Sequence, residues 1–245
     1  MVIPNINTGL EHKQIAKVVS SNYKKISKDY ISFATQWLID SNKVFGDCEK
    51  FYILIYLFNK NLEFYNKNLI YFDYESFLKT NKFEVQKINI VNIAKNLNIP
   101  KESVRRKLLE LEKGKIIQRT KKDILINKEY INLFDVVNNI NYLSKVLFEI
   151  YNICYEERII NKEISRDDIV QTIKKNFSFI MFHYFQFIFP WVLTWKKFFE
   201  NDIECKLLWN VIVTNKSLRL ENKVIKATAK ITPGIAYPEI EKLVK

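Results

Sequence analysis

From Lys28 onward, apolar residues recur at the spacing of an α-helix. They occupy positions i, i+3, i+4, i+7 and i+8 along the chain: Tyr30, Phe33, Ala34, Trp37 and Leu38. Gly46 is expected to end this helix, and Asp47 is expected to cap the next. The stripe of that second helix consists of Phe51, Leu54, Ile55, Phe58 and Leu62. Residues 1–27 show no firm period and are expected to form a loosely held N-terminal arm, and residues 63–86 a connector.

The second half of the chain has the same helical character. Its first long helix is marked by Leu143, Val146, Leu147, Ile150 and Cys154. Asp167 and Asp168 suit the first turn of a further helix. Residues 177–195 contain no charged residue and are nearly long enough to span a membrane, with Pro190 as a kink or break. Because aromatic and several polar residues dominate this run, a buried core helix is favoured over a membrane helix.

Composition narrows the fold class. Of the 245 residues, 48% are hydrophobic and 14% are aromatic, which excludes a disordered chain. Only 4 glycines and 5 prolines occur, too few for the turns of a many-stranded barrel. We therefore expect a mainly α-helical protein with an arm at 1–27, a helical region at 28–130 and a C-terminal helical domain at 131–245. The similarity of Asn59–Phe64 to Asn215–Leu220 allows a duplicated helical unit.

The basic residues are concentrated in one segment. Residues 87–128 hold twelve Lys/Arg and four Asp/Glu, a local net charge of +8 out of +12 for the whole chain. Codon bias toward lysine would spread the charge evenly, so it does not account for this concentration. A polyanionic partner that binds this segment does account for it.

The same segment has a distinctive order of apolar residues. Ile88 and Ile90 predict a short strand, and Ile93 and Leu97 lie one turn apart on a short first helix. Asn98-Ile99 is expected to form a turn, with Ile99 buried inside the corner. Pro100 suits the first position of a second helix that extends to about Lys113.

The second helix is expected to have a buried and an exposed face. Val104, Leu108 and Leu111 share one face and predict contact with the core. The opposite face is polar and presents Glu102, Ser103, Arg106 and Glu110, with Arg105 at one margin and Lys101 at the N-terminal end. Gly114 ends the helix, and two strands follow at residues 116–119 and 124–126, joined by a basic tip.

This segment resembles the winged helix-turn-helix superfamily of bacterial transcriptional regulators. The resemblance rests on Ile93-Ala94, Leu97, Ile99-Pro100, Ser103 to Arg106, Leu108 and Leu111-Glu112, followed by the basic hairpin. It is similar to the winged helices of MarR-type and Crp-type proteins, and it covers residues 87–128 alone. The resemblance implies a recognition helix at about 100–113 in the DNA major groove and a wing at 116–127 on the backbone or minor groove.

The candidate DNA-binding residues follow from this arrangement. Arginine can read guanine edges, while lysine, serine and the hairpin suit phosphates, and glutamate can accept from cytosine. The alternative for each charged residue is a solvated helix face or a polar turn, and for the glutamates a salt bridge to a neighbouring cation. The candidates are Lys95, Lys101, Glu102, Ser103, Arg105, Arg106, Arg119, Lys121 and Lys122.

We expect a sequence-specific DNA-binding regulator rather than an enzyme, because no nucleophile–base pair or phosphate loop is evident. The expected partners are double-stranded DNA and a second copy of the chain, as a homodimer. Because the other helices are rich in aromatic residues, a small apolar effector is also expected. With two histidines and isolated cysteines, we expect no metal or cofactor and a reducing, cytoplasmic location. Two alternatives remain: a membrane-associated protein anchored by residues 177–195, and a winged helix that binds a protein.

Overall fold

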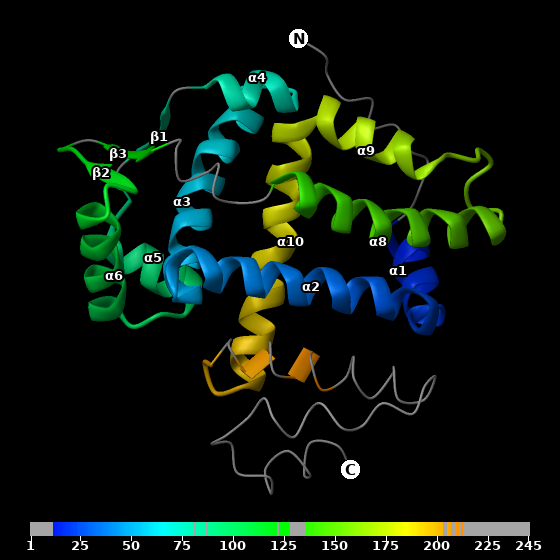
Figure 1. Cartoon of the computed structure of the whole chain (residues 1–245), viewed down its shortest axis with the longest axis horizontal. Coiled ribbons are helices and arrows are strands. Elements are labelled where there is room, and N and C mark those ends of the chain that lie inside the picture. The colour runs from blue at the N-terminus through cyan, green and yellow to red at the C-terminus, as the bar shows by residue number, and fades with distance from the viewer. Residues whose placement is uncertain are drawn as a thin grey trace, which may run out of the picture.

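The computed structural model describes residues 12–80, 82–86, 88–121, 123–127 and 136–202, and residues 205, 206, 209, 210 and 212. Within them the chain is mainly helical, which confirms the expected class, and one small antiparallel sheet of three strands is present (Figure 1). The helices are α1 (His12–Ser21), α2 (Tyr23–Phe45), α3 (Cys48–Lys67), α4 (Tyr74–Lys79), α5 (Ile90–Leu97), α6 (Lys101–Lys113), α8 (Val136–Glu156), α9 (Arg166–Lys175) and α10 (Phe177–Phe198). The strands are β1 (Lys82–Gln86), β2 (Ile117–Arg119) and β3 (Asp123–Asn127).

The corner between α2 and α3 forms as the sequence predicts. Gly46 has a φ of 62°, a left-handed conformation that glycine adopts at little cost, and its N–H donates to the carbonyl of Asn42. The side chain of Asp47 then accepts from the backbone N–H groups of Glu49 at 2.8 Å and Lys50 at 3.2 Å. Both the helix end at Gly46 and the cap at Asp47 are confirmed.

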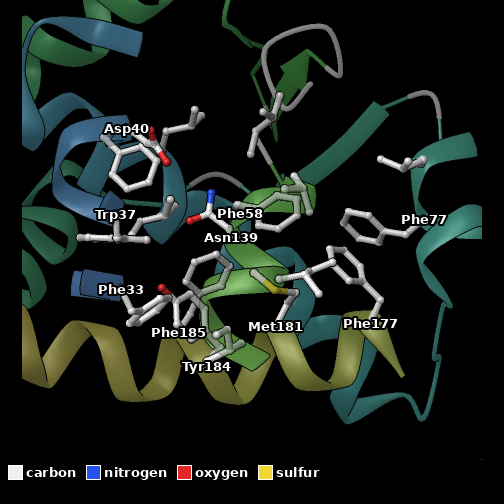
Figure 2. A pocket seen from close by; sticks show the side chains of 18 residues that line it. Phe33, Trp37, Asp40, Phe58, Phe77, Asn139, Phe177, Met181, Tyr184 and Phe185 are labelled. Carbon is white, nitrogen blue, oxygen red and sulfur yellow. The ribbon is translucent and has the colours of Figure 1, made fainter. Parts of the chain in front are cut away.

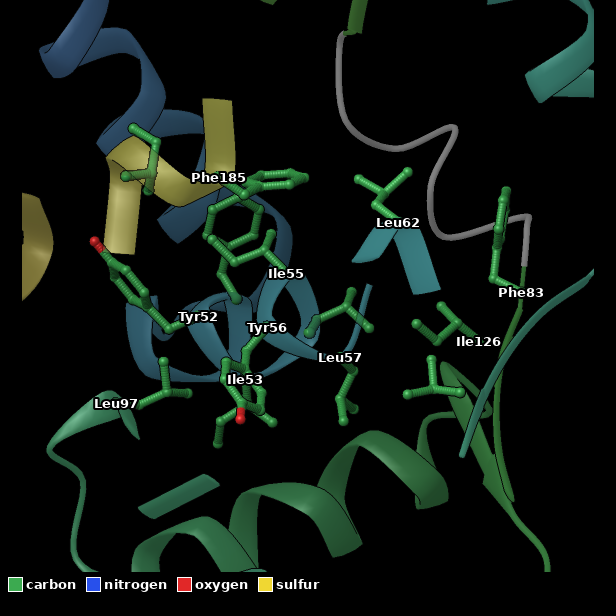
Figure 3. Close-up of a cluster of buried hydrophobic side chains, with 14 of the residues drawn as sticks. Tyr52, Ile53, Ile55, Tyr56, Leu57, Leu62, Phe83, Leu97, Ile126 and Phe185 are labelled. Carbon is green, nitrogen blue, oxygen red and sulfur yellow. The ribbon is translucent and has the colours of Figure 1, made fainter. Parts of the chain in front are cut away.

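Helix α3 is the central element of the fold. It packs against α2, α5, α6, α10 and β1, so apolar residues around most of its circumference are buried. Ile53 and Leu57 are fully buried. Figure 3 shows Leu62 on the side of α3 that faces Phe83 and Ile126 of the sheet, and Ile53 on the side near Leu97. A helix with so little exposed surface derives its stability from packing on every side.

Aromatic side chains join α10 to α2, α3 and α4. The ring of Phe185 on α10 meets Phe58 of α3 edge-to-face, with centroids 6.1 Å apart. Tyr184 meets Phe33 of α2 at 6.0 Å. Figure 2 shows these four side chains pointing into a common space, together with Trp37. Edge-to-face contacts stabilise such pairs by about 0.5–1.5 kcal/mol beyond area burial.

The N-terminal part is more ordered than an arm. Residues 12–21 form α1, and α2 begins at Tyr23 rather than near Lys28. Val18 and Ile26 are buried and pack in one cluster with Ile153 and Cys154 of α8. This packing against α8 is the physical reason that the expected arm at 1–27 is wrong for the described residues.

The expected connector at 63–86 and the expected strand at Ile88–Ile90 are also wrong. Residues 63–67 continue α3, and the strand lies earlier, at β1, where Phe83 pairs with Ile126 and Val85 with Ile124 of β3. Phe83 and Val85 are both buried, so alternation within residues 82–86 places one face on the core. Ile90 instead begins α5, because the side chain of Asn89 caps that helix by accepting from Val91 N–H at 2.9 Å.

Helices α9 and α10 follow one another with little interruption. Ser165 and Asp168 form a reciprocal capping box, which confirms the helix start expected at Asp167-Asp168. Helix α10 continues through Pro190 to Phe198, so the proline does not break it.

In the described part of the chain, α10 is the single helix long and apolar enough to cross a membrane. Within the 18-residue apolar stretch of this helix, 28% is buried inside the protein. Its buried face includes Phe185, Ile188 and Val192, whereas Phe187 and Phe198 are exposed. The helix therefore contributes one apolar face to the core and exposes another.

One hydrophobic core extends across residue 130. The largest buried cluster contains Ile53 of α3 and Ile126 of β3, and also Ile140 of α8, Ile173 of α9 and Ile188 of α10. The boundary expected between residues 28–130 and 131–245 therefore does not separate two cores. The similarity that suggested a duplicated unit involves Asn215–Leu220, which lies outside the described residues.

Substitution of Ile188 by alanine tests whether this core is shared. We expect Ile188→Ala to lower the free energy of unfolding by about 2–4 kcal/mol, because it leaves a cavity beside α2 in the shared core. Gln186→Ala, at an exposed position of the same helix, should change it by less than about 0.5 kcal/mol. Urea unfolding followed by circular dichroism should show one transition in both variants, and two separate transitions would contradict a shared core.

Candidate nucleic-acid interface

Helices α5 and α6 are joined by a tight left-handed turn. Asn98 has a φ of 49°, and the backbone N–H groups of Asn98 and Ile99 both donate to the carbonyl of Ala94. Ile99 is buried inside the corner, as its position in the sequence predicts. Pro100 lies immediately before α6, one residue earlier than expected, and fixes the direction in which the helix starts.

The inward face of α6 is confirmed. Val104, Leu108 and Leu111 are each at most 1% exposed and pack in the main core with Ile93 and Leu97 of α5. The reason is the helical period, which places positions i, i+4 and i+7 on one side.

The outward face of α6 is polar and accessible. Lys101, Glu102, Arg105 and Arg106 are exposed, and Ser103 is half-buried beside them. Lys95, on the preceding helix, is also exposed. The structure therefore gathers the sequence-predicted residues of α6 on one surface, concentrated in its first half.

Strands β2 and β3 form a hairpin next to α6. The sheet order is β1-β3-β2, with both pairs antiparallel, and Arg119 pairs with Ile124 at the end of the hairpin. Thr120 closes the tip: its N–H donates to the carbonyl of Asp123 at 2.8 Å, and its hydroxyl accepts from Asp123 N–H at 2.9 Å. Lys121 lies at this tip and is exposed, whereas Lys122 lies outside the described residues.

Arg119 has a different environment from the other candidate cations. Its Nε donates to Oε2 of Glu112 at 2.9 Å, its Nη2 donates to the same oxygen, and its backbone N–H donates to Oε1 at 3.2 Å. This hydrogen bonding holds the pKa of Glu112 below its ordinary value. Arg119 thus connects β2 to α6 and positions the hairpin, and its guanidinium is half-buried rather than presented to solvent.

The exposed arginines have weaker partners. Arg105 lies 3.7 Å from Glu102, and Arg106 lies 3.8 Å from Glu110, so both glutamates have the neighbouring-cation contacts that the sequence allowed. Glu110 also lies 2.5 Å from Nζ of Lys50, whose hydrogen bond lowers the pKa of that carboxyl. Exposed pairs of this kind contribute about 0–1 kcal/mol, so Arg105 and Arg106 can exchange them for an anionic ligand.

Two buried lysines, which sequence reasoning missed, fix the orientation of α6. Lys107 is 6% exposed; its Nζ contacts Oδ2 of Asp47 and lies 3.4 Å from Oε2 of Glu49. Lys196 of α10 is 2% exposed and donates to Glu49 at 3.1 Å and to the carbonyl of Asn98 at 3.0 Å. The start of α3 therefore binds α6 directly, and α10 binds the turn before α6.

A signal for Lys107 was present in the sequence. It stands three residues after Val104 and four before Leu111, so it lies on the inward side of α6. A lysine on that side needs a buried anion, and Asp47 and Glu49 supply one from the neighbouring α3. No spacing in the sequence links Lys196 to the same carboxylates.

The chemistry of the remaining residues is limited. Within the described ranges, no group of three or more His, Cys, Asp or Glu could hold a metal ion. Cys48 and Cys154 are buried thiols, and Cys205 is partly exposed.

Comparison of the chain with protein-family models, curated proteins and solved structures finds no match.

Burial raises the pKa of Asp47, but the hydrogen bond and charge of Lys107 and two backbone N–H groups outweigh it, so the pKa lies below its ordinary value. A carboxyl with a depressed folded-state pKa stabilises the fold above its unfolded pKa of about 3.9. That stability is lost as the pH falls through the folded-state pKa. Asp47 is thus a pH-sensitive link between α3 and α6.

Replacement of Lys107 by methionine tests this link. We expect Lys107→Met to lower the free energy of unfolding by about 1–3 kcal/mol at pH 7, because Asp47 and Glu49 lose a buried cation. The difference from the wild type should shrink as the pH falls from about 4, the unfolded-state pKa of an aspartate, through the lower folded-state pKa of Asp47. Lys113→Met, at an exposed position of the same helix, is the control, and urea midpoints across pH give the measurement. A loss of stability that does not depend on pH, or that is equal in the control, would contradict the link.

Proposed function

We propose that this protein binds double-stranded DNA sequence-specifically as a transcriptional regulator, through a winged helix-turn-helix formed by residues 74–127. The order α4-β1-α5-α6-β2-β3, with sheet order β1-β3-β2, supports this reading of the fold. In it, α5 and α6 are the helix-turn-helix and the β2–β3 hairpin is the wing. The observation that carries the proposal is the exposed, basic first half of α6, on a helix whose last turn holds that hairpin.

The proposed recognition helix is α6. The B-DNA major groove is about 12 Å wide and accepts one helix. Arg105 and Arg106 are the residues proposed to read bases, because their guanidinium groups are exposed and arginine binds guanine O6 and N7 bidentately. Lys101 and Ser103 are placed near the start of the helix, where phosphate contacts fix the position of the protein on the duplex.

The other candidates have secondary roles in this proposal. Lys121 at the hairpin tip and Lys122 after it suit the phosphates or the adjacent minor groove. Lys95 is placed to contact the DNA backbone beside the major groove. Glu102 can accept a hydrogen bond from a cytosine amino group or keep its ion pair with Arg105. Arg119 acts indirectly, because its bonds to Glu112 hold the hairpin against α6.

Charge distribution supports a nucleic-acid partner over a neutral one. The local net charge of +8 falls on residues 87–128, which contain α5, α6 and the hairpin. These elements lie together at one end of the molecule, opposite α1 (Figure 1). A basic surface of this kind releases counterions from DNA and gives binding that weakens steeply with salt.

We further propose that the protein acts as a homodimer. A single winged helix contacts few base pairs, and two copies on an inverted repeat multiply both affinity and specificity. Exposed apolar side chains of α10, such as Phe187 and Phe198, are compatible with a contact between copies.

The double variant Arg105→Ala/Arg106→Ala tests the proposed function. We expect the dissociation constant for a bound duplex to rise roughly 30-fold or more at moderate salt. The slope of log K against log salt should change by less than about 1, because in this proposal both arginines read bases and the phosphate contacts at the start of α6 remain. Fluorescence anisotropy with a labelled duplex gives both quantities.

The matched control is Lys13→Ala/Lys17→Ala. It removes the same charge from exposed positions of α1, at the opposite end of the molecule from α6 (Figure 1). This control should weaken binding by less than about threefold if the contact is local. Equal effects of the two double variants would mean that overall charge alone attracts DNA, and the proposed recognition helix would be wrong.

A further inference from the structure

A cavity of about 110 Å³ lies between α2, α3, α4, α8, α10 and the end of β3. Figure 2 shows the side chains around it, with Trp37, Asp40 and Asn139 toward one side and Phe77 and Phe177 toward the other. The cavity is separate from the α6 surface, which makes no contribution to its lining. Nothing in the proposed DNA contact uses this space.

The lining suits a flat apolar molecule. Most of the wall is aromatic or aliphatic, with aromatic rings from α2, α3, α4 and α10. Phe58 meets Phe185 at 90° and Phe33 meets Tyr184 at 69°, so the rings present both edges and faces. An aromatic ligand can add to such an arrangement in the edge-to-face geometry that ring quadrupoles favour.

Two polar side chains define the chemistry at one side of the cavity. Asp40 and Asn139 supply the carboxylate and the amide among the residues that line it. One oxygen of Asp40 accepts from Nε2 of Gln36 at 2.8 Å. Because a carboxylate has about four lone-pair sites, Asp40 can accept a further hydrogen bond from a ligand hydroxyl or amine. The same carboxylate repels an anion, and the largely apolar lining makes the transfer of a charged group costly, so the favoured ligand is uncharged.

The volume limits the size of the ligand. An engineered apolar cavity of about 150 Å³ binds benzene, so a cavity of about 110 Å³ limits the ligand to a single ring. Larger fused-ring molecules require the surrounding helices to move apart.

We propose that this cavity is a binding site for a small, neutral, single-ring aromatic molecule with a hydrogen-bond donor, and that its occupancy changes the affinity for DNA. This coupling rests on the proposed function. It follows because elements that line the cavity also contact α6 and the hairpin. Helix α3 lines the cavity through Phe51, Leu54 and Phe58, and its first turn holds Lys107 of α6. Strand β3 lines it through Ile126, which pairs with β2 of the hairpin.

Phenol is the probe for binding, and the first measurement contains no DNA. Isothermal titration calorimetry should show saturable binding of phenol to the full chain, and benzoate, of similar size but anionic, should bind at least tenfold more weakly. Leu143→Trp fills the cavity from α8 and should weaken phenol binding at least tenfold. Leu147→Trp, one turn further along the same helix and outside the lining, should leave the phenol affinity within about threefold of wild type.

Circular dichroism and the unfolding midpoint establish that each variant is folded before binding is compared. Absence of saturable phenol binding to the wild type, or equal loss in both tryptophan variants, overturns the proposed site. A loss confined to Leu143→Trp supports it.

The second measurement tests coupling. Saturating phenol should change the duplex dissociation constant at least threefold, and the duplex should change the phenol dissociation constant by the same factor, because linkage is reciprocal. The effect should disappear in Leu143→Trp. Phenol binding without any change in duplex affinity overturns the coupling. If no duplex binds at all, the proposed function fails while the calorimetry still decides the ligand site.

Discussion

The arrangement of the candidate interface depends on the buried ion pairs at the start of α3. Asp47 caps α3 and at the same time binds Lys107 of α6, and Glu49 binds Lys107 and Lys196. Two lysines that are at most 6% exposed are costly to bury without anions, so both helices are held where these carboxylates lie. The consequence is that α6 points its other side, with Arg105 and Arg106, away from the core. The orientation of the basic face thus depends on these buried ion pairs, which lie outside the proposed DNA contact.

Helix α3 connects these ion pairs to the rest of the molecule through its packing contacts. One side of it meets α5, α6 and β1, and another meets α2 and the aromatic side chains of α10. The proposed DNA-binding segment is therefore not an independent module attached by a linker, since its core is continuous with that of α8, α9 and α10. This continuity gives the aromatic cavity a physical route to α6 through α3 and β3.

The local elements were the most predictable part of the structure. Capping by Asp47, the end of α2 at Gly46 and the inward stripe Val104-Leu108-Leu111 depend on near neighbours, and all three formed as expected. The strand was placed wrongly because Ile88 and Ile90 have higher β-propensity than Lys82–Gln86, whereas pairing of Phe83 and Val85 with β3 decided the outcome. Long-range pairs such as Lys196–Glu49 leave no spacing signal in the chain. For the candidate site, exposure of Lys101, Arg105 and Arg106 was predictable, but the bonds of Arg119 to Glu112 needed the hairpin geometry.

We propose that the exposed face of α6 reads a DNA sequence. Selection of bound sequences from a random duplex pool at moderate salt, with the wild type and Arg105→Ala/Arg106→Ala in parallel, tests it most directly. The wild type should enrich an inverted repeat whose half-sites lie about one helical turn, roughly 34 Å, or a multiple of it apart. The double variant should lose this enrichment. A wild-type pool that shows no enriched sequence, or the same enrichment in the double variant, would show that this face of α6 does not read DNA.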